Sequence, residues 1–159
     1  MRDQDVLFMH RAVEIALEAE RRGNPPIGSI LTLGGEEIAS GECSLMAPHF
    51  HPGRHAETEA LRGVAVDLWP RAREMTCYTT LEPCPMCLGA LLLHDVGRIV
   101  YGARDPLGGS EVLLPHLPPY FDRENGKPEW IGPILPSVCD PLFERAIDRL
   151  GLRSMRDPL

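Results

Sequence analysis

A histidine, a glutamate and two cysteines are spaced in a way that suits a catalytic metal ion. His55 stands two residues before Glu57, and Cys84 and Cys87 follow further along the chain. One imidazole and two thiolates can bind a zinc ion and leave its fourth coordination position open to water. A carboxylate close to the imidazole can carry protons to and from that water. These residue types in this order predict a hydrolytic zinc centre.

Local spacing indicates how helices would position these groups. Cys84 and Cys87 are one helical turn apart, so both sulfur atoms can face the same point. Pro85 between them suits the first turn of a helix, which we predict over 85–94. The positive end of that helix would favour ionised thiols. His55 directly precedes a second helical pattern, predicted over 56–67, so two helix starts are expected to meet at one metal.

A pair of cysteines with this spacing also occurs in redox motifs and in structural zinc sites. A structural site needs a fourth ligand, and the other candidates are Cys43, Cys77, Cys139, His49 and His51. None of them forms a second closely spaced ligand pair that competes with His55, and a redox motif would leave His55 and Glu57 unexplained. We therefore favour the catalytic zinc site, although a glutamate in the first turn of a helix is commonly a surface residue.

The order of the two motifs resembles a known family. His-x-Glu followed by Pro-Cys-x-x-Cys is the pattern of the zinc-dependent nucleobase deaminases. The chain resembles the cytidine deaminase superfamily, and within it the branch of guanine deaminases, fungal-type cytosine deaminases and tRNA adenosine deaminases. The resemblance spans residues 5 to about 110 and is carried by residues 26–30, 55–57, 79–90 and 97–105.

This resemblance implies roles for individual residues. His55, Cys84 and Cys87 would bind one zinc ion per chain, and Glu57 would be the proton carrier. The backbone N–H of Ala56 would donate to a carbonyl or a ring nitrogen of the base. The reaction implied is hydrolysis of an amino group on a heterocyclic ring, with release of ammonia.

One departure from this branch concerns substrate contacts. Its members usually carry an Asn in the loop after the second strand, and the usual interval before His55 falls on Ser44, with Cys43 beside it. A hydroxyl provides only part of the hydrogen bonding of an amide. We expect Ser44 to contact the substrate. Asn24 and Asp105 are weaker substrate-contact candidates, because turn-forming roles explain each equally well.

The remaining pattern predicts the elements around the site. A helix is expected over 5–22, strands over 27–33, 36–40, 75–80 and 97–101, and a last helix from Pro141 to Leu150. Gly34-Gly35 indicates a hairpin, and the later alternation of strands and helices indicates parallel crossovers. We predict an α/β fold with three α/β/α layers, a mixed sheet of about five strands, and a single domain over 1–159.

The C-terminal third, residues 105–159, is rich in proline as far as Pro141, and its role is less defined. It is too apolar for a solvated linker. Its aromatic residues Tyr120, Phe121 and Trp130 could form a lid over a planar base or could pack against the domain or a partner subunit, and packing is the favoured interpretation.

Charge and composition bear on the substrate and the location. The net charge is −7, and Lys127 is the only lysine. A surface that neutralises several phosphates is normally basic, so charge disfavours an RNA partner without excluding one. The N-terminus has no apolar signal region and no apolar run is long enough to cross a membrane, so we expect a cytoplasmic protein without a membrane partner.

These observations support three functional hypotheses. The favoured one is hydrolytic deamination of a free nucleobase, a nucleoside or a similar aminated heterocycle. The alternative is deamination of an adenosine in the anticodon loop of tRNA. The third is a non-catalytic zinc-bound interaction module. The apolar C-terminal third and the family resemblance also predict a homo-oligomer.

Overall fold

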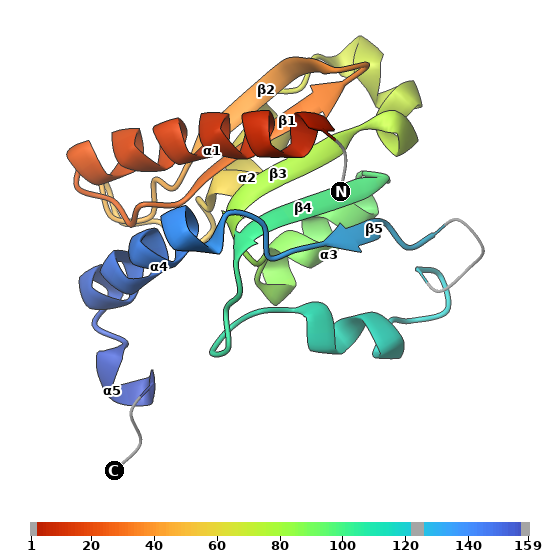
Figure 1. Ribbon diagram of the computed structural model, residues 1–159. Coiled ribbons are helices and arrows are strands. Elements are labelled where there is room, and N and C mark those ends of the chain that lie inside the picture. Colours follow the sequence, from red (N-terminus) through yellow and green to blue (C-terminus); the bar gives the residue numbers. More distant parts are fainter. Residues whose placement is uncertain (1–2, 122–125, 157–159) are drawn as a thin grey trace.

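The computed structural model describes residues 3–121 and 126–156. Its helices and strands follow one another in the order α1 (Asp3–Arg21), β1 (Gly28–Leu33), β2 (Glu36–Glu42), α2 (Ala56–Arg62), η1 (Val66–Glu74), β3 (Thr76–Leu81), α3 (Pro85–Leu93), β4 (Arg98–Ala103), η2 (Glu111–His116), β5 (Glu129–Ile131), α4 (Pro136–Leu150) and α5 (Arg153–Arg156). Figure 1 shows how these elements surround the sheet.

The sheet has five strands in the order β2-β1-β3-β4-β5. Strand β1 is antiparallel to both β2 and β3, whereas β3, β4 and β5 are parallel to one another. The hairpin between β1 and β2 turns through Gly34 and Gly35, whose φ angles of 63° and 85° favour glycine. The mixed five-stranded sheet and the hairpin are therefore confirmed.

Helices cover both faces of the sheet. In Figure 1, α1 and α4 lie on one face while α2 and α3 lie behind the sheet. Successive residues of a strand point to opposite faces, so Ile30 packs with the first pair of helices and Leu31 with the second. Tyr78 and Cys77 of β3 divide in the same way. The three-layer α/β/α prediction is confirmed.

Helix α2 carries the start of the predicted site, and its depth is set by Gly41 of β2. A Cβ at Gly41 would lie 2.2 Å from the carbonyl oxygen of Ala56 and 2.3 Å from the amide nitrogen of Ala60. The helix backbone therefore lies directly on the strand backbone. This contact brings the first turn of α2 to the sheet edge where β3 also ends.

A buried ion pair ties α1 to the middle of the sheet. Asp5 has no exposed surface, and its two carboxylate oxygens accept hydrogen bonds from Arg98 at 2.7 and 2.8 Å. The hydroxyl of Tyr78 donates to the same carboxylate at 2.9 Å. Arg98 also contacts Glu129 at 3.1 Å, which joins β5 to the network.

Two helix boundaries differ from the prediction. The helix expected over 56–67 ends at Arg62, where Gly63 caps it, and residues 66–74 form a separate 3-10 helix. The last helix begins at Pro136 rather than Pro141. Pro136 occupies the favourable first turn. Pro141 is accommodated inside the helix, because Cys139, Leu142 and Phe143 around it are buried against the sheet.

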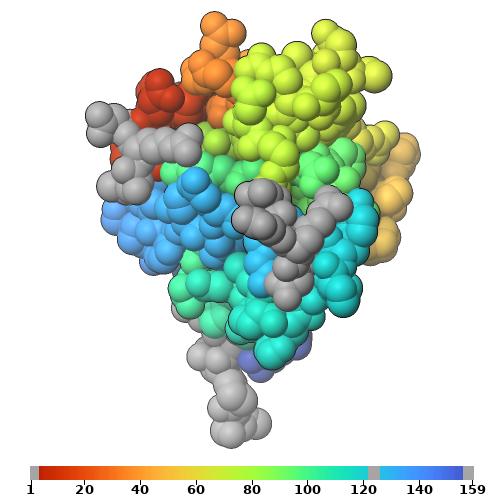
Figure 2. Space-filling model, turned by 90° about the vertical axis from the view of Figure 1, so that its right-hand side faces the viewer, coloured from red at the N-terminus to blue at the C-terminus, as the bar shows by residue number. Residues whose placement is uncertain are grey.

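The segment treated as irregular contains the fifth strand. Trp130 lies in β5 and packs on Tyr101, with ring centroids 5.7 Å apart. Packing is therefore the correct interpretation for Trp130. Tyr120 and Phe121 contact each other edge to face at 5.0 Å, and their role as a lid stays a prediction. In Figure 2, the segment from about 105 to 121 and the segment from about 126 to 140 both lie on this side of the molecule.

Candidate metal centre and active site

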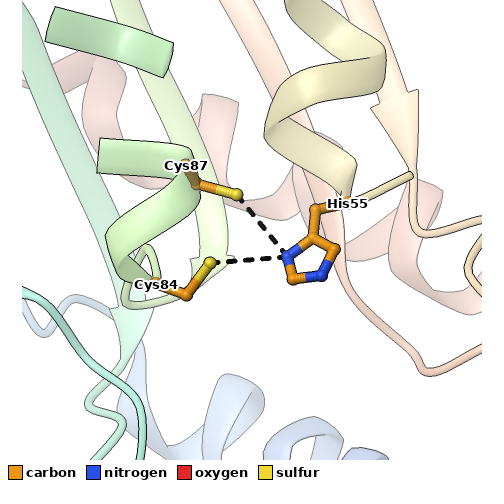
Figure 3. A group of neighbouring side chains, drawn as sticks. All are labelled: His55, Cys84 and Cys87. Carbon is orange, nitrogen blue, oxygen red and sulfur yellow. Dashed lines mark hydrogen bonds between the residues drawn. The ribbon is translucent and has the colours of Figure 1, made fainter. Parts of the chain in front are cut away.

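Two helix starts bring the three predicted metal ligands together. His55 is the residue that precedes α2, and Cys84 is the one that precedes α3; both have extended backbone angles. Pro85 is the first residue of α3, and Cys87 follows within its first turn. Figure 3 shows the imidazole of His55 facing both sulfur atoms from the opposite helix.

The distances between these side chains fit a zinc ion. The Nδ1 atom of His55 lies 3.5 Å from the sulfur of Cys84 and 3.6 Å from that of Cys87. A nitrogen and a sulfur bound to one tetrahedral zinc ion lie about 3.5 Å apart. In the described ranges, no fourth histidine, cysteine or carboxylate joins this group. The ligand set thus matches a catalytic site, which keeps one position open, rather than a closed structural site.

The pKa values of the two ligand thiols are shifted in opposite directions. The hydrogen bond from Cys87, together with the contact to His55, lowers the pKa of Cys84 to about 4. The same bond raises the pKa of Cys87, and the contact with Cys84 raises that of His55. Zinc is bound by thiolates and neutral imidazole, so binding would release the protons that remain on these groups.

Glu57 lies beside the ligands and is almost fully buried, with 4% of its surface exposed. One carboxylate oxygen accepts a hydrogen bond from the hydroxyl of Thr79 at 2.9 Å. The other accepts one from the sulfur of Cys87 at 3.3 Å. Burial raises the pKa of Glu57. A carboxyl group that can hold or release a proton next to a metal position suits acid–base chemistry.

These groups line a cavity of about 140 Å³. Its walls are formed by Pro25, Ile27, Cys43, Leu45, His55, Ala56, Glu57, Leu81, Glu82, Cys84, Asp105 and Leu150. Most ligand pockets exceed about 300 Å³. A cavity of this size has room for one ring system, while the rest of a larger substrate would remain outside.

Of the predicted substrate contacts, Ala56 and Asp105 line the cavity. One oxygen of the Asp105 carboxylate accepts the backbone N–H groups of Leu107 and Gly108, at 2.9 and 3.0 Å. Asp105 therefore has both the turn-forming role and a place in the cavity wall. Its contact with a substrate stays a prediction.

Ser44 and Asn24 are not among the residues that line the cavity. Cys43, not Ser44, lines the cavity, and the hydroxyl of Ser44 donates to the carbonyl of Glu42 at 3.3 Å. A contact between Ser44 and a substrate stays a prediction. Asn24 is outside the cavity lining, because its side-chain oxygen accepts the N–H groups of Met46 and Ala47 at 2.8 and 2.9 Å.

Sequence analysis missed Thr79 and Glu82. Thr79 lies on β3 and positions the Glu57 carboxylate. Glu82 is part of the stretch 79–90 that carried the family resemblance, but its only local indication was a glutamate at the end of an apolar strand. Both side chains act through contacts with residues far away in the chain, which local spacing does not reveal.

Comparison with known proteins identifies the family of this chain. Residues 2–103 match the family described as the cytidine and deoxycytidylate deaminase zinc-binding region. The chain belongs to this deaminase family. It is a zinc-dependent deaminase whose zinc site is formed by His55, Cys84 and Cys87.

Several proteins similar to this deaminase are known. It is 39% identical to the tRNA-specific adenosine deaminase of Bacillus subtilis (strain 168) over 86% of this chain and 84% of that protein. It is 38% identical to the corresponding protein of Haemophilus influenzae over 96% of this chain and 94% of that protein. Among the described residues, no helix of the deaminase is long and apolar enough to cross a membrane.

Two solved structures extend the comparison. A structure from a study of A-to-I editing by tRNA:A34 deaminases superposes with a TM-score of 0.68 at 29% identity, over 86% of this chain and 99% of that chain. The guanine deaminase of Bacillus subtilis gives a TM-score of 0.58 at 25% identity, over 91% and 94% of the two chains. Two of the three groups in the branch expected from the motifs, the tRNA adenosine deaminases and the guanine deaminases, are thus represented.

Proposed function

We propose that this deaminase acts on an adenosine in the anticodon loop of tRNA. The observation that carries the proposal is its similarity to tRNA-specific adenosine deaminases, which extends over most of both chains. The similarity to a guanine deaminase is weaker in sequence identity. The hypothesis ranked second from the sequence therefore becomes the main one.

The size of the cavity supports this substrate. A volume of about 140 Å³ accepts one base and leaves the sugar and phosphates outside. Enzymes that modify a base in a nucleic acid take that base out of its stack and bind it alone in a pocket. An adenosine that projects from a loop is not base-paired, so less free energy is needed to move it into the pocket.

Glu57 is proposed to carry the protons of the reaction. Zinc, when bound, supplies the Lewis acidity that makes water a nucleophile at neutral pH. Glu57 would accept a proton from the attacking water and deliver it to the ring nitrogen beside the amino-bearing carbon. The second proton, from the hydroxyl group added to the ring carbon, would then pass through Glu57 to the amino group, which leaves as ammonia while the ring gains a carbonyl oxygen. Thr79 holds one oxygen of Glu57 during these transfers.

The start of α2 is proposed to orient the base. The first N–H groups of a helix have no acceptor within the helix. Ala56 is the first residue of α2 and lines the cavity. Its N–H is therefore suited to donate to a ring nitrogen, while the apolar wall of Pro25, Ile27 and Leu45 contacts the faces of the ring.

Ammonia release from a panel of substrates tests the proposal. The panel contains a tRNA anticodon stem-loop with adenosine at the wobble position, the same stem-loop with guanosine there, and free adenine, adenosine, guanine and cytosine. We expect kcat/KM for the adenosine stem-loop to exceed that for every free compound by at least about a hundredfold, and to fall with added salt. Faster turnover of a free base would contradict the proposal.

Free heterocycles remain the second candidate because of charge. The chain has a net charge of −7 and one lysine, so binding of a polyanion must rely on a local group of arginines. A free base needs no such surface. The non-catalytic module gains no support, since the chain belongs to an enzyme family.

The homo-oligomer stays a prediction. Exposed apolar side chains on α3, in the segment after β4 and on η2, namely Met86, Leu93, Leu107, Val112 and Leu113, are suited to a contact between copies of the chain. Light scattering at micromolar concentration should report a dimer or a larger assembly. A monomer alone would contradict this expectation.

A further inference from the structure

Glu82 is a buried carboxylate that the proposed chemistry does not use. It follows β3, lines the active-site cavity and is 4% exposed. One of its oxygens accepts the backbone N–H of Asp105 at 3.1 Å. The other accepts the backbone N–H of Glu111 at 3.0 Å. Both oxygens are thus directed at the two ends of one segment, residues 105–111.

Ser110 reinforces the same connection from the other side. It is fully buried, and its hydroxyl donates to the carbonyl of Pro83 at 2.6 Å. Its backbone N–H donates to the same carbonyl at 3.1 Å. Pro83 directly precedes the zinc ligand Cys84. The segment 105–111 is therefore bonded to the two residues that lead into the metal site.

Gly109 allows this close approach. A Cβ at Gly109 would lie 2.4 Å from the carboxyl carbon of Glu82 and 2.5 Å from the carbonyl oxygen of Asp105. Any side chain there would displace either the carboxylate or the segment. Glu82, Gly109 and Ser110 thus form a fitted unit, which we call the Glu82 clamp.

The clamp holds a wall of the active site. Asp105 lines the catalytic cavity. Asp105, Leu107 and Gly108 also line an adjoining apolar cavity of about 220 Å³, which reaches α4 and α5. The position of this wall relative to the zinc ligands sets the space in which a substrate ring can lie.

We propose that Glu82 is a positioning residue that fixes the segment 105–111 against the zinc-bearing start of α3. Its carboxylate replaces water for two backbone N–H groups that would otherwise have to be solvated inside the cavity wall. The wall is then held in the shape that receives the ring, so loosening of the wall weakens binding of the ring rather than the chemical step. This role deepens the deaminase function and rests on it, but it does not depend on which amino-bearing ring is the substrate.

The main test is the substitution Glu82→Gln. The amide keeps the shape of the side chain but offers a single acceptor oxygen, so its NH₂ group faces one of the two N–H donors. We expect amide hydrogen exchange at Asp105 or Glu111 to become at least about tenfold faster, because one protecting bond is lost. KM should rise about tenfold or more, while kcat stays within about threefold and zinc remains at one per chain.

A matched control lies on the same segment. The side chain of Glu111 is 40% exposed and pairs with Arg104 at 2.9 Å. The substitution Glu111→Gln removes a carboxylate next to the clamp but keeps the backbone N–H that Glu82 binds. Its KM and its amide exchange should match those of the unmodified protein.

Two further variants test the clamp by changing its other two residues. Gly109→Ala should raise KM in the same direction as Glu82→Gln, because the added methyl group displaces the carboxylate. Ser110→Ala removes one hydrogen bond, keeps the backbone bond and should have a smaller effect. If one of the three clamp variants folds poorly, the other two still test the proposal.

Two outcomes would overturn the proposal. Unchanged amide exchange and unchanged KM in Glu82→Gln would show that the clamp does not hold the wall. Loss of zinc with an equal fall in kcat and kcat/KM would instead assign Glu82 to support of the metal. If the unmodified protein prefers a free base, the tRNA proposal fails, and the clamp is tested with that base.

Discussion

Two buried carboxylates of this deaminase have opposite surroundings. Asp5 is fully buried and receives hydrogen bonds from the guanidinium of Arg98 and the hydroxyl of Tyr78. Glu57 is nearly as buried, but the side chains that donate to it are the hydroxyl of Thr79 and the thiol of Cys87, neither of which carries a positive charge. One carboxylate is neutralised by a fixed cation, whereas the other lies at the edge of a cavity beside a metal position.

This difference separates stability from function. A buried charge is costly unless a partner compensates it. Arg98 compensates the charge of Asp5, and the pair joins α1 to the sheet. Burial raises the pKa of Glu57, which leaves that group able to take up and release a proton. Burial alone therefore does not identify a catalytic carboxylate, but burial with incomplete compensation beside a cavity does.

The largest effect is expected at the metal ligands themselves. Cys87→Ala removes one of three ligands, and we expect elemental analysis to show loss of zinc together with loss of measurable turnover. Cys77→Ala is the matched control, since Cys77 is equally buried but packs in the core between β3 and the helices α2 and α3. Normal zinc content in Cys87→Ala would disprove the ligand assignment.

The second-largest effect is expected on turnover when Glu57, the carboxylate beside the metal position, is changed. Glu57→Gln keeps the volume of the side chain and removes its ability to carry a proton. We expect turnover to fall at least about a hundredfold, with zinc content and the midpoint of thermal unfolding unchanged. Ammonia release close to that of the unmodified protein would refute the role of Glu57.

The third effect falls on stability alone. Asp5→Asn removes the buried counter-ion of Arg98 and leaves only the largely exposed carboxylate of Glu129 beside it, and loss of a buried partner typically costs about 3–5 kcal/mol. Urea unfolding should report this loss, while kcat of the folded protein stays within about twofold because the network lies outside the cavity lining. Glu18→Gln breaks an exposed ion pair with Arg21 on the same helix and serves as the control.

If Asp5→Asn lowered kcat as strongly as Glu57→Gln, the two carboxylates would not be separable in this way. The ion pair would then have to be regarded as part of the support of the active site.

The smallest effect concerns the donor to Glu57. Thr79→Val keeps the shape of the side chain and removes the hydroxyl that donates to the Glu57 carboxylate at 2.9 Å. A hydrogen bond of this kind contributes about 0.5–1.5 kcal/mol, so kcat should fall about twofold to tenfold without loss of zinc. Thr76→Val, at the other end of β3, should leave kcat unchanged.

Much of the site was predictable because its chemistry is local in the sequence. The zinc ligands stand at helix starts that Pro85 and the apolar periodicity indicate, and the structure joins them as expected. The hairpin at Gly34 and Gly35 follows from the conformational freedom of glycine. Short-range rules were sufficient for these elements.

Long-range features were not predictable in this way. Cys43 and Ser44 differ by one residue, and a loop between a strand and a helix can absorb one residue without leaving a trace in the spacing. The contacts of Glu82 join residues that only the fold brings together. The ranking of the two substrate hypotheses changed for a related reason, since net charge is a property of the whole chain and says little about one surface.

Gly41 has a consequence for how variants of this deaminase are interpreted. It never lines the cavity, yet its missing side chain lets the backbone of α2 lie on β2. In a library in which every position is randomised, position 41 will tolerate almost no other residue, and the inactive clones will resemble those of a catalytic position. Screens that score activity alone would therefore count Gly41 among the active-site residues, whereas a parallel measurement of protein abundance would separate it from them.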